Sequence, residues 1–145
     1  MVCTYTNVAV DNLVEGLANR GLRPLRVGYT AKIRGDVRPW SLEKRIEEHA
    51  LKPRYDKLQA EIDQLRKAMI DITEKIPKIE SIYQITKLKA VHSNMDADLS
   101  RKLGRKWILY MIMTRDIVEN SDAVSIHCFY PLSDILSDYR SVQLA

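Results

Sequence analysis

The pattern of apolar and polar positions predicts a strand, a helix and a second strand at the start of the chain. Residues 2–6 form a short apolar run typical of a buried strand, and Thr6 or Asn7 can cap a helix over about 8–20. Gly21 stands where that helix should end, and Leu25–Tyr29 is a second apolar run. This order predicts a β-α-β unit, with the two strands paired in parallel through a right-handed crossover.

The middle of the chain has the spacing of helices. Thr30–Pro39 reads as a loop or linker, and Ser41 is a plausible cap for a helix over about 42–51. Apolar positions then recur at alternating spacings of three and four, as in a heptad seam, until Pro77 should end the helix. The residues of this seam are Tyr55, Leu58, Ile62, Leu65, Met69, Ile72 and Ile76.

A looser apolar series of the same period runs from Ile82 to Trp107 and could fold back against the seam. An internal helical hairpin explains two consecutive stripes better than an intermolecular coiled coil does. If the seam instead forms an intermolecular coiled coil, the alternative function is a non-enzymatic module that binds a protein partner through residues 55–76.

A third strand is expected near the end of the sequence. Ala123–Phe129 is an apolar run closed by Pro131, and it would extend the same parallel sheet, whereas Ser133–Ala145 has no firm pattern. The predicted organisation is a β-α-β part over residues 1–40, a helical insertion over 41–118, and a returning strand with a divergent tail over 119–145.

Composition is that of a globular domain, with 145 residues, 46% of them hydrophobic and 29% charged. No apolar run reaches the roughly 18 residues of a membrane span, and Met1–Cys3 does not resemble the start of a secretory signal. We expect a nuclear or cytoplasmic protein without a membrane partner. The cysteines and histidines are scattered, so the sequence predicts no metal site.

The net charge of +4 is unevenly distributed, because residues 1–40 hold six basic side chains against three acidic ones. The basic six are Arg20, Arg23, Arg26, Lys32, Arg34 and Arg38. This excess modestly favours an anionic partner. A second basic cluster over residues 101–106 could contact a phosphate backbone, although a solvated helix face is the simpler interpretation.

The strand-to-helix junction at Thr6–Asn7 is the strongest candidate site. A helix start presents backbone N–H groups and the positive end of the helix dipole, which suit a phosphate. An ordinary capped turn without a ligand is the simpler interpretation of the spacing alone.

The sequence lacks a recognisable catalytic set. Its nearest match to a phosphate-binding loop begins at Gly16 and Gly21, but Leu22–Arg23 stands where Lys followed by Ser or Thr is required. No Asp-Glu pair follows an apolar strand to hold a metal ion. We therefore expect the chain alone neither to bind nor to hydrolyse ATP.

The segment Cys3–Leu13 resembles motif Ia of the superfamily 1B helicases related to the nonsense-mediated-decay RNA helicase and the immunoglobulin mu-binding DNA helicase. The resemblance continues through Glu15–Leu17, Gly21–Leu22 and Leu25–Gly28. It implies an α/β fold, a partial RecA-like parallel sheet of the P-loop NTPase type with a helical-hairpin insertion. It breaks off near Cys128, because Phe129–Leu132 replaces the Thr- and Gly-rich loop of that family.

By this resemblance the chain is an internal fragment of the first motor domain of an ATP-dependent helicase, and ATP and Mg²⁺ are cofactors only of a full-length parent. Thr6 and Asn7 would contact the backbone of a single-stranded nucleic acid, and Asp11 would support the turn that presents them. We also expect Arg26 to take part in binding, which should be weak, salt-sensitive and independent of sequence.

Overall fold

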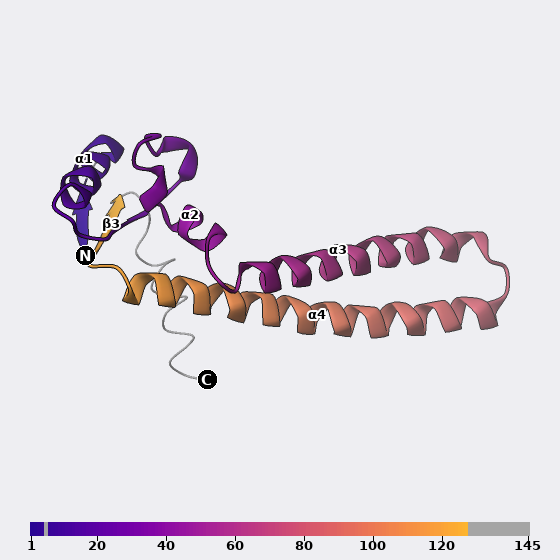
Figure 1. Cartoon of the computed structure of the whole chain (residues 1–145). Helices are drawn as coiled ribbons and strands as arrows, with labels where there is room; N and C mark the ends of the chain where they lie inside the picture. The colour runs from indigo at the N-terminus through magenta and orange to yellow at the C-terminus, as the bar shows by residue number, and fades with distance from the viewer. Residues whose placement is uncertain (5, 128–145) are drawn as a thin grey trace. The chain divides into compact units, whose positions relative to one another are not determined.

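The computed structural model describes residues 1–4 and 6–127 (Figure 1). It divides into two compact units. The sheet unit comprises Met1–His49 together with the chain from Thr114 onward, and the hairpin unit comprises Ala50–Met113. The last two residues of the expected third strand, Cys128 and Phe129, and the tail that follows them lie outside the described residues.

The sheet unit contains three parallel strands, which are β1 (Val2–Thr4), β2 (Pro24–Val27) and β3 (Ala123–His127). Their order is β1-β3-β2, so β3 lies between the other two and pairs with both. The prediction of a parallel sheet is confirmed, but the prediction that the first two strands pair directly is wrong. A short β-α-β sequence fixes the direction of its strands but leaves room for a third strand between them.

Helix α1 (Asn7–Ala18) begins at the predicted junction and ends two residues before the predicted end at residue 20. Thr6 is the N-cap, with φ −132° and ψ 146°, and its side-chain oxygen accepts a hydrogen bond from the Ala9 amide at 3.1 Å. At the other end Gly21 has φ +79°, a conformation that glycine adopts without strain. The amide of Gly21 donates to Ala18 O at 2.9 Å and that of Leu22 to Leu17 O at 3.2 Å, which closes the helix.

The core beneath α1 includes residues from the segment that the sequence predicts to be a loop. Val10 and Val14 of α1 pack with Ile33 and Val37, and Trp40 lies against this cluster. Residues 30–40 include two short 3₁₀ turns, η1 (Thr30–Lys32) and η2 (Arg38–Trp40). The buried or half-buried positions 33, 37 and 40 of this segment are spaced by four and three residues. The Gly- and Arg-rich composition of the segment conceals this apolar spacing in the sequence.

Helix α2 (Leu42–Glu47) is shorter than expected and belongs to the sheet unit. Ser41 caps it, since its side-chain oxygen accepts from the Lys44 amide at 3.3 Å. Leu42 and Ile46 are buried. The compact units therefore separate after His49, whereas the expected organisation places this helix with the insertion.

The hairpin unit is formed by α3 (Lys52–Lys75), the turn η3 (Ile76–Lys78) and most of α4 (Ile82–Glu119). The two helices run antiparallel and side by side (Figure 1). Ile62 of the seam is fully buried. Between the two helices, Lys102 Nζ of α4 donates to Glu61 Oε2 of α3 at 2.5 Å. The seam thus lies inside a hairpin within the chain, as the simpler interpretation of the two stripes predicts.

Candidate nucleic-acid interface

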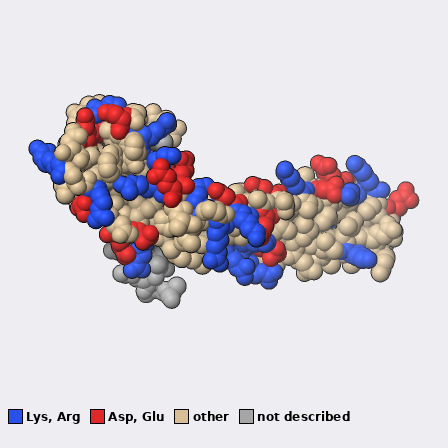
Figure 2. Space-filling view, in the orientation of Figure 1, with Lys and Arg blue, Asp and Glu red and all other residues tan. Residues whose placement is uncertain are grey.

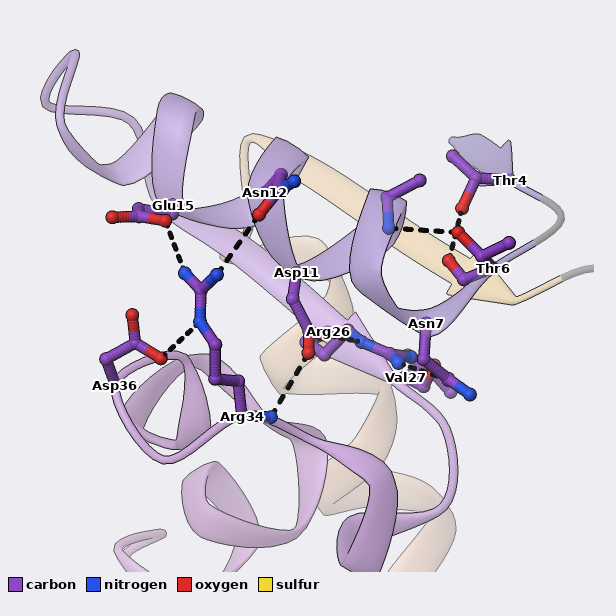
Figure 3. A network of polar contacts seen from close by, with 11 residues as sticks. Thr4, Thr6, Asn7, Asp11, Asn12, Glu15, Arg26, Val27, Arg34 and Asp36 are labelled. Carbon is purple, nitrogen blue, oxygen red and sulfur yellow. Dashed lines mark hydrogen bonds and ion pairs between the residues drawn. The ribbon is translucent and has the colours of Figure 1, made fainter.

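The candidate site begins where β1 ends and α1 starts. Thr6 is exposed, its side chain caps α1, and its carbonyl oxygen accepts from the Thr4 hydroxyl at 3.1 Å (Figure 3). The Asn7 and Val8 amides belong to the first turn and have no acceptor within the helix. The predicted position of Thr6 and Asn7, between the carboxyl end of a strand and the start of a helix, is confirmed.

Asn7 is half-buried, and its side chain is held by β2. The side-chain oxygen Oδ1 accepts a hydrogen bond from Arg26 Nη2 at 2.8 Å. The two residues are 19 positions apart in the sequence, so only the packing of α1 on the strand joins them.

Arg26 has no exposed surface. Its Nε donates to Asp11 Oδ1 at 3.0 Å, and its Nη1 donates to the carbonyl oxygen of Val27 at 2.6 Å. This burial is at odds with the expectation that Arg26 takes part in binding by contacting a nucleic acid, because all of the guanidinium nitrogens already donate to protein oxygens. A buried carboxylate partner here overrides the general preference of arginine for the surface.

Asp11 joins three parts of the sheet unit. It is 3% exposed, Oδ1 receives the bond from Arg26, and Oδ2 accepts from the Arg34 amide at 3.1 Å. Its carboxylate therefore connects α1 to β2 and to the turn after η1. These contacts are of the supporting kind that the resemblance to motif Ia implies for Asp11.

Arg34 forms a second, exposed network beside Asp11 (Figure 3). Its Nε donates to Asp36 Oδ1 at 2.7 Å, its Nη1 donates to Asn12 Oδ1 at 3.1 Å, and its Nη2 pairs with Glu15. Hydrogen bonds to Asp36 and then to Glu15 raise the pKa of Arg34, and the same contact lowers the pKa of Asp36. The charge of Arg34 is thus neutralised by the protein itself.

The sequence predicts no role for Arg34 in this region beyond its charge. Its partners Asn12 and Glu15 are three positions apart and therefore lie on one face of α1. These two polar positions on one helix face were the available signal for a polar partner of α1. Nothing in the local sequence indicates that this partner is Arg34.

Gly28 allows the Arg26 side chain to turn back beneath the backbone. Its φ is +150°, and a Cβ atom at this position would lie 2.6 Å from Arg26 Nη1. A side chain here would collide with the guanidinium in a backbone conformation that already disfavours one. The requirement is invisible in the sequence, where Gly28 follows an ordinary strand.

The other candidates from the sequence fall elsewhere. The basic cluster over residues 101–106 belongs to the hairpin unit, where Lys102 pairs with Glu61 and Lys106 lies 5.2 Å from the centre of the Tyr55 ring. Among the described residues, no group of three metal-ligating side chains comes together. Within the same residues, no helix is both long and apolar enough to cross a membrane.

Comparisons with known proteins give one family. The family model described as an AAA domain matches residues 1–126, which include α1, its network with β2 and the whole hairpin. A comparison with curated proteins finds no match. Since the family match spans most of the sequence, the chain belongs to the AAA domain family AAA_11, a domain typical of superfamily 1 helicases.

Proposed function

We propose that this chain is the part of a helicase motor domain that contacts single-stranded nucleic acid, and that Thr6 and Asn7 make the contact. The observation that carries this proposal is the exposed N-cap at Thr6, directly after β1. Membership of the AAA domain family supports it. The resemblance of Cys3–Leu13 to motif Ia supports the finer assignment to superfamily 1B.

The chemistry of such a contact follows from the free groups at the helix start. Unpaired amides of the first turn and the positive end of the α1 dipole stabilise a phosphate oxygen. Contacts of this kind fix the register of a strand without reading its bases. Binding should therefore be weak, sensitive to salt and nearly equal for different sequences.

ATP hydrolysis is proposed only for a motor domain that also contains a phosphate-binding loop, with ATP and Mg²⁺ as its cofactors. The printed sequence has no Gly-x-x-x-x-Gly-Lys segment followed by Ser or Thr. Strand binding by Thr6 and Asn7 is therefore the activity that these residues can be tested for directly.

A fluorescence anisotropy titration of the full chain with labelled oligo-dT and oligo-U tests the proposal. We expect the logarithm of the association constant to fall linearly with the logarithm of salt, with a slope of about −0.7 per phosphate contacted. Asn7→Ala should weaken binding, whereas Asn12→Ala, on the same helix but away from its start, should not. Absence of binding at low salt, or equal effects of the two substitutions, would overturn the proposal.

A further inference from the structure

Arg26 determines which atom of the Asn7 side chain faces away from the protein. A guanidinium has only hydrogen-bond donors, so the Asn7 atom at 2.8 Å from Arg26 Nη2 must be the carbonyl oxygen. The amide nitrogen Nδ2, with its two hydrogens, is then the other end of the group. Among the described residues, this nitrogen has no hydrogen-bond acceptor.

The orientation is fixed because Arg26 itself cannot move. Its side chain is 0% exposed. The ion pair with Asp11 holds Nε, and the hydrogen bond to Val27 O holds Nη1. The backbone of Gly28 lies so close to Nη1 that even a Cβ atom on Gly28 would collide with it. A flipped Asn7 amide would direct its hydrogens at the hydrogens of Arg26 and leave Nη2 of this fully buried side chain without its acceptor, which is costly.

We propose that Arg26 is a positioning residue that holds the Asn7 amide so that only donors face the ligand, and that the site therefore selects acceptor oxygens of a sugar-phosphate backbone. This inference rests on the proposed function and adds its chemical selectivity. The Asn7 side-chain N–H groups and the backbone amides of the first turn then have the same polarity. Groups that can only donate, such as base amino groups, find no partner there.

Asn7→Asp separates this role from a purely structural one. The carboxylate keeps an oxygen for Arg26 Nη2 and stands at the favourable end of the helix dipole, so we expect unchanged or higher resistance to urea. Its second oxygen replaces the amide hydrogens by an acceptor with a negative charge. We expect oligo-dT and oligo-U to bind about ten- to a hundredfold more weakly.

Asn12→Asp is the matched control. It makes the same chemical change on the same helix, and Asn12 Oδ1 likewise accepts from an arginine, Arg34 Nη1, at 3.1 Å. Because Asn12 lies one and a half turns into α1, its added charge should change affinity by no more than about twofold at moderate salt. A specific loss in Asn7→Asp alone therefore reports polarity and not net charge.

Arg26→Lys is the second variant, because it keeps the charge but loses the fork that reaches Asp11, Val27 and Asn7 together. Two-dimensional ¹⁵N–¹H spectra should show a folded protein in which the Asn7 side-chain amide signals move, and oligonucleotide affinity should fall. Unchanged Asn7 amide signals in this variant would overturn the positioning role even if affinity fell.

The outcomes distinguish the two proposals. If the wild type binds, Asn7→Ala weakens binding and Asn7→Asp binds like the wild type, the polarity inference is overturned and the proposed function stands. If Asn7→Asp and Asn12→Asp weaken binding equally, charge alone explains the effect and the inference is again overturned. A wild type that binds neither oligonucleotide overturns both.

Discussion

A buried ion pair of the sheet unit and an exposed ion pair of the hairpin unit have different roles. In the sheet unit the Arg26–Asp11 pair has exposed side-chain fractions of 0% and 5%, and it holds α1 against β2. In the hairpin the side chains of the Lys75–Asp71 pair are 59% and 60% exposed, and charges of both signs are interspersed over the face that Figure 2 shows. A buried pair therefore defines the position of its neighbours, whereas an exposed pair keeps a helix solvated.

The largest expected effect is that of breaking the buried pair. Arg26→Met leaves the Asp11 carboxylate buried without its partner, and we expect a loss of about 3–5 kcal/mol in the free energy of unfolding. Urea unfolding followed by Trp40 fluorescence in a Trp107→Phe background reports the sheet unit, because Trp40 lies against its core.

The hairpin supplies the control for this measurement. Lys75→Met removes one member of an exposed pair and should cost less than about 0.5 kcal/mol, as followed by circular dichroism. Equal losses in the two variants would mean that burial does not distinguish the pairs.

Two glycines should respond to the same substitution with opposite signs. Gly28→Ala introduces a Cβ atom 2.6 Å from Arg26 Nη1 at a φ of +150°. We expect a loss of about 1–3 kcal/mol in urea unfolding from this strain. Gly104 lies within α4, where a new Cβ would meet no atom within 4 Å, so Gly104→Ala should stabilise that helix by about 0.5–1 kcal/mol. A stabilising Gly28→Ala would contradict the role assigned to this position.

Two threonines give the next largest contrast. Thr6→Ala removes the N-cap of α1 and should cost about 0.5–2 kcal/mol in thermal or urea unfolding, whereas Thr6→Ser should retain most of that stability. Thr73 of α3 donates only to the Met69 carbonyl at 2.9 Å, a bond that adds little within a helix. Thr73→Ala should therefore leave the unfolding midpoint nearly unchanged, and a loss as large as that of Thr6→Ala would contradict the capping argument.

The smallest effect is an acid dependence that differs between the units. Hydrogen bonds from the Arg23 side chain, then its backbone amide, lower the pKa of Asp122 below its ordinary value of 3.8. Hydrogen bonding by Lys102 likewise lowers the pKa of Glu61 in the hairpin below 4.5. Each carboxylate adds stability above its ordinary pKa, and this stability is lost as the pH falls through the lower pKa of the folded state.

Urea midpoints measured between about pH 6 and pH 3 check this prediction. The Glu61 contribution should begin to fade at a higher pH than that of Asp122, because its ordinary pKa is higher. Glu61→Gln and Asp122→Asn should each reduce the fall of the urea midpoint at acid pH, the first in the hairpin unit and the second in the sheet unit. If the pH dependence of the urea midpoint is unchanged in either variant, the corresponding ion pair does not contribute to the acid dependence of stability.

The sequence by itself determined the local elements. Thr6 and Ser41 mark helix starts, Gly21 marks a helix end, and the heptad spacing marks α3, because each of these signals acts within about four residues along the chain. The position of Asn7 at the start of α1 could therefore be predicted, although the sequence also predicted a loop at 30–39 that proves to hold core residues.

Only the tertiary structure decided what surrounds the candidate site. The insertion of β3 between β1 and β2, the burial of Arg26 and the need for Gly28 all depend on backbone edges and side chains that meet across many residues. Arg26 meets Asp11 and Asn7 at separations of 15 and 19 residues. No local pattern distinguishes an arginine that will be buried beside a carboxylate from one that will face water, because the free energy of a charge depends on the partner it finds after folding.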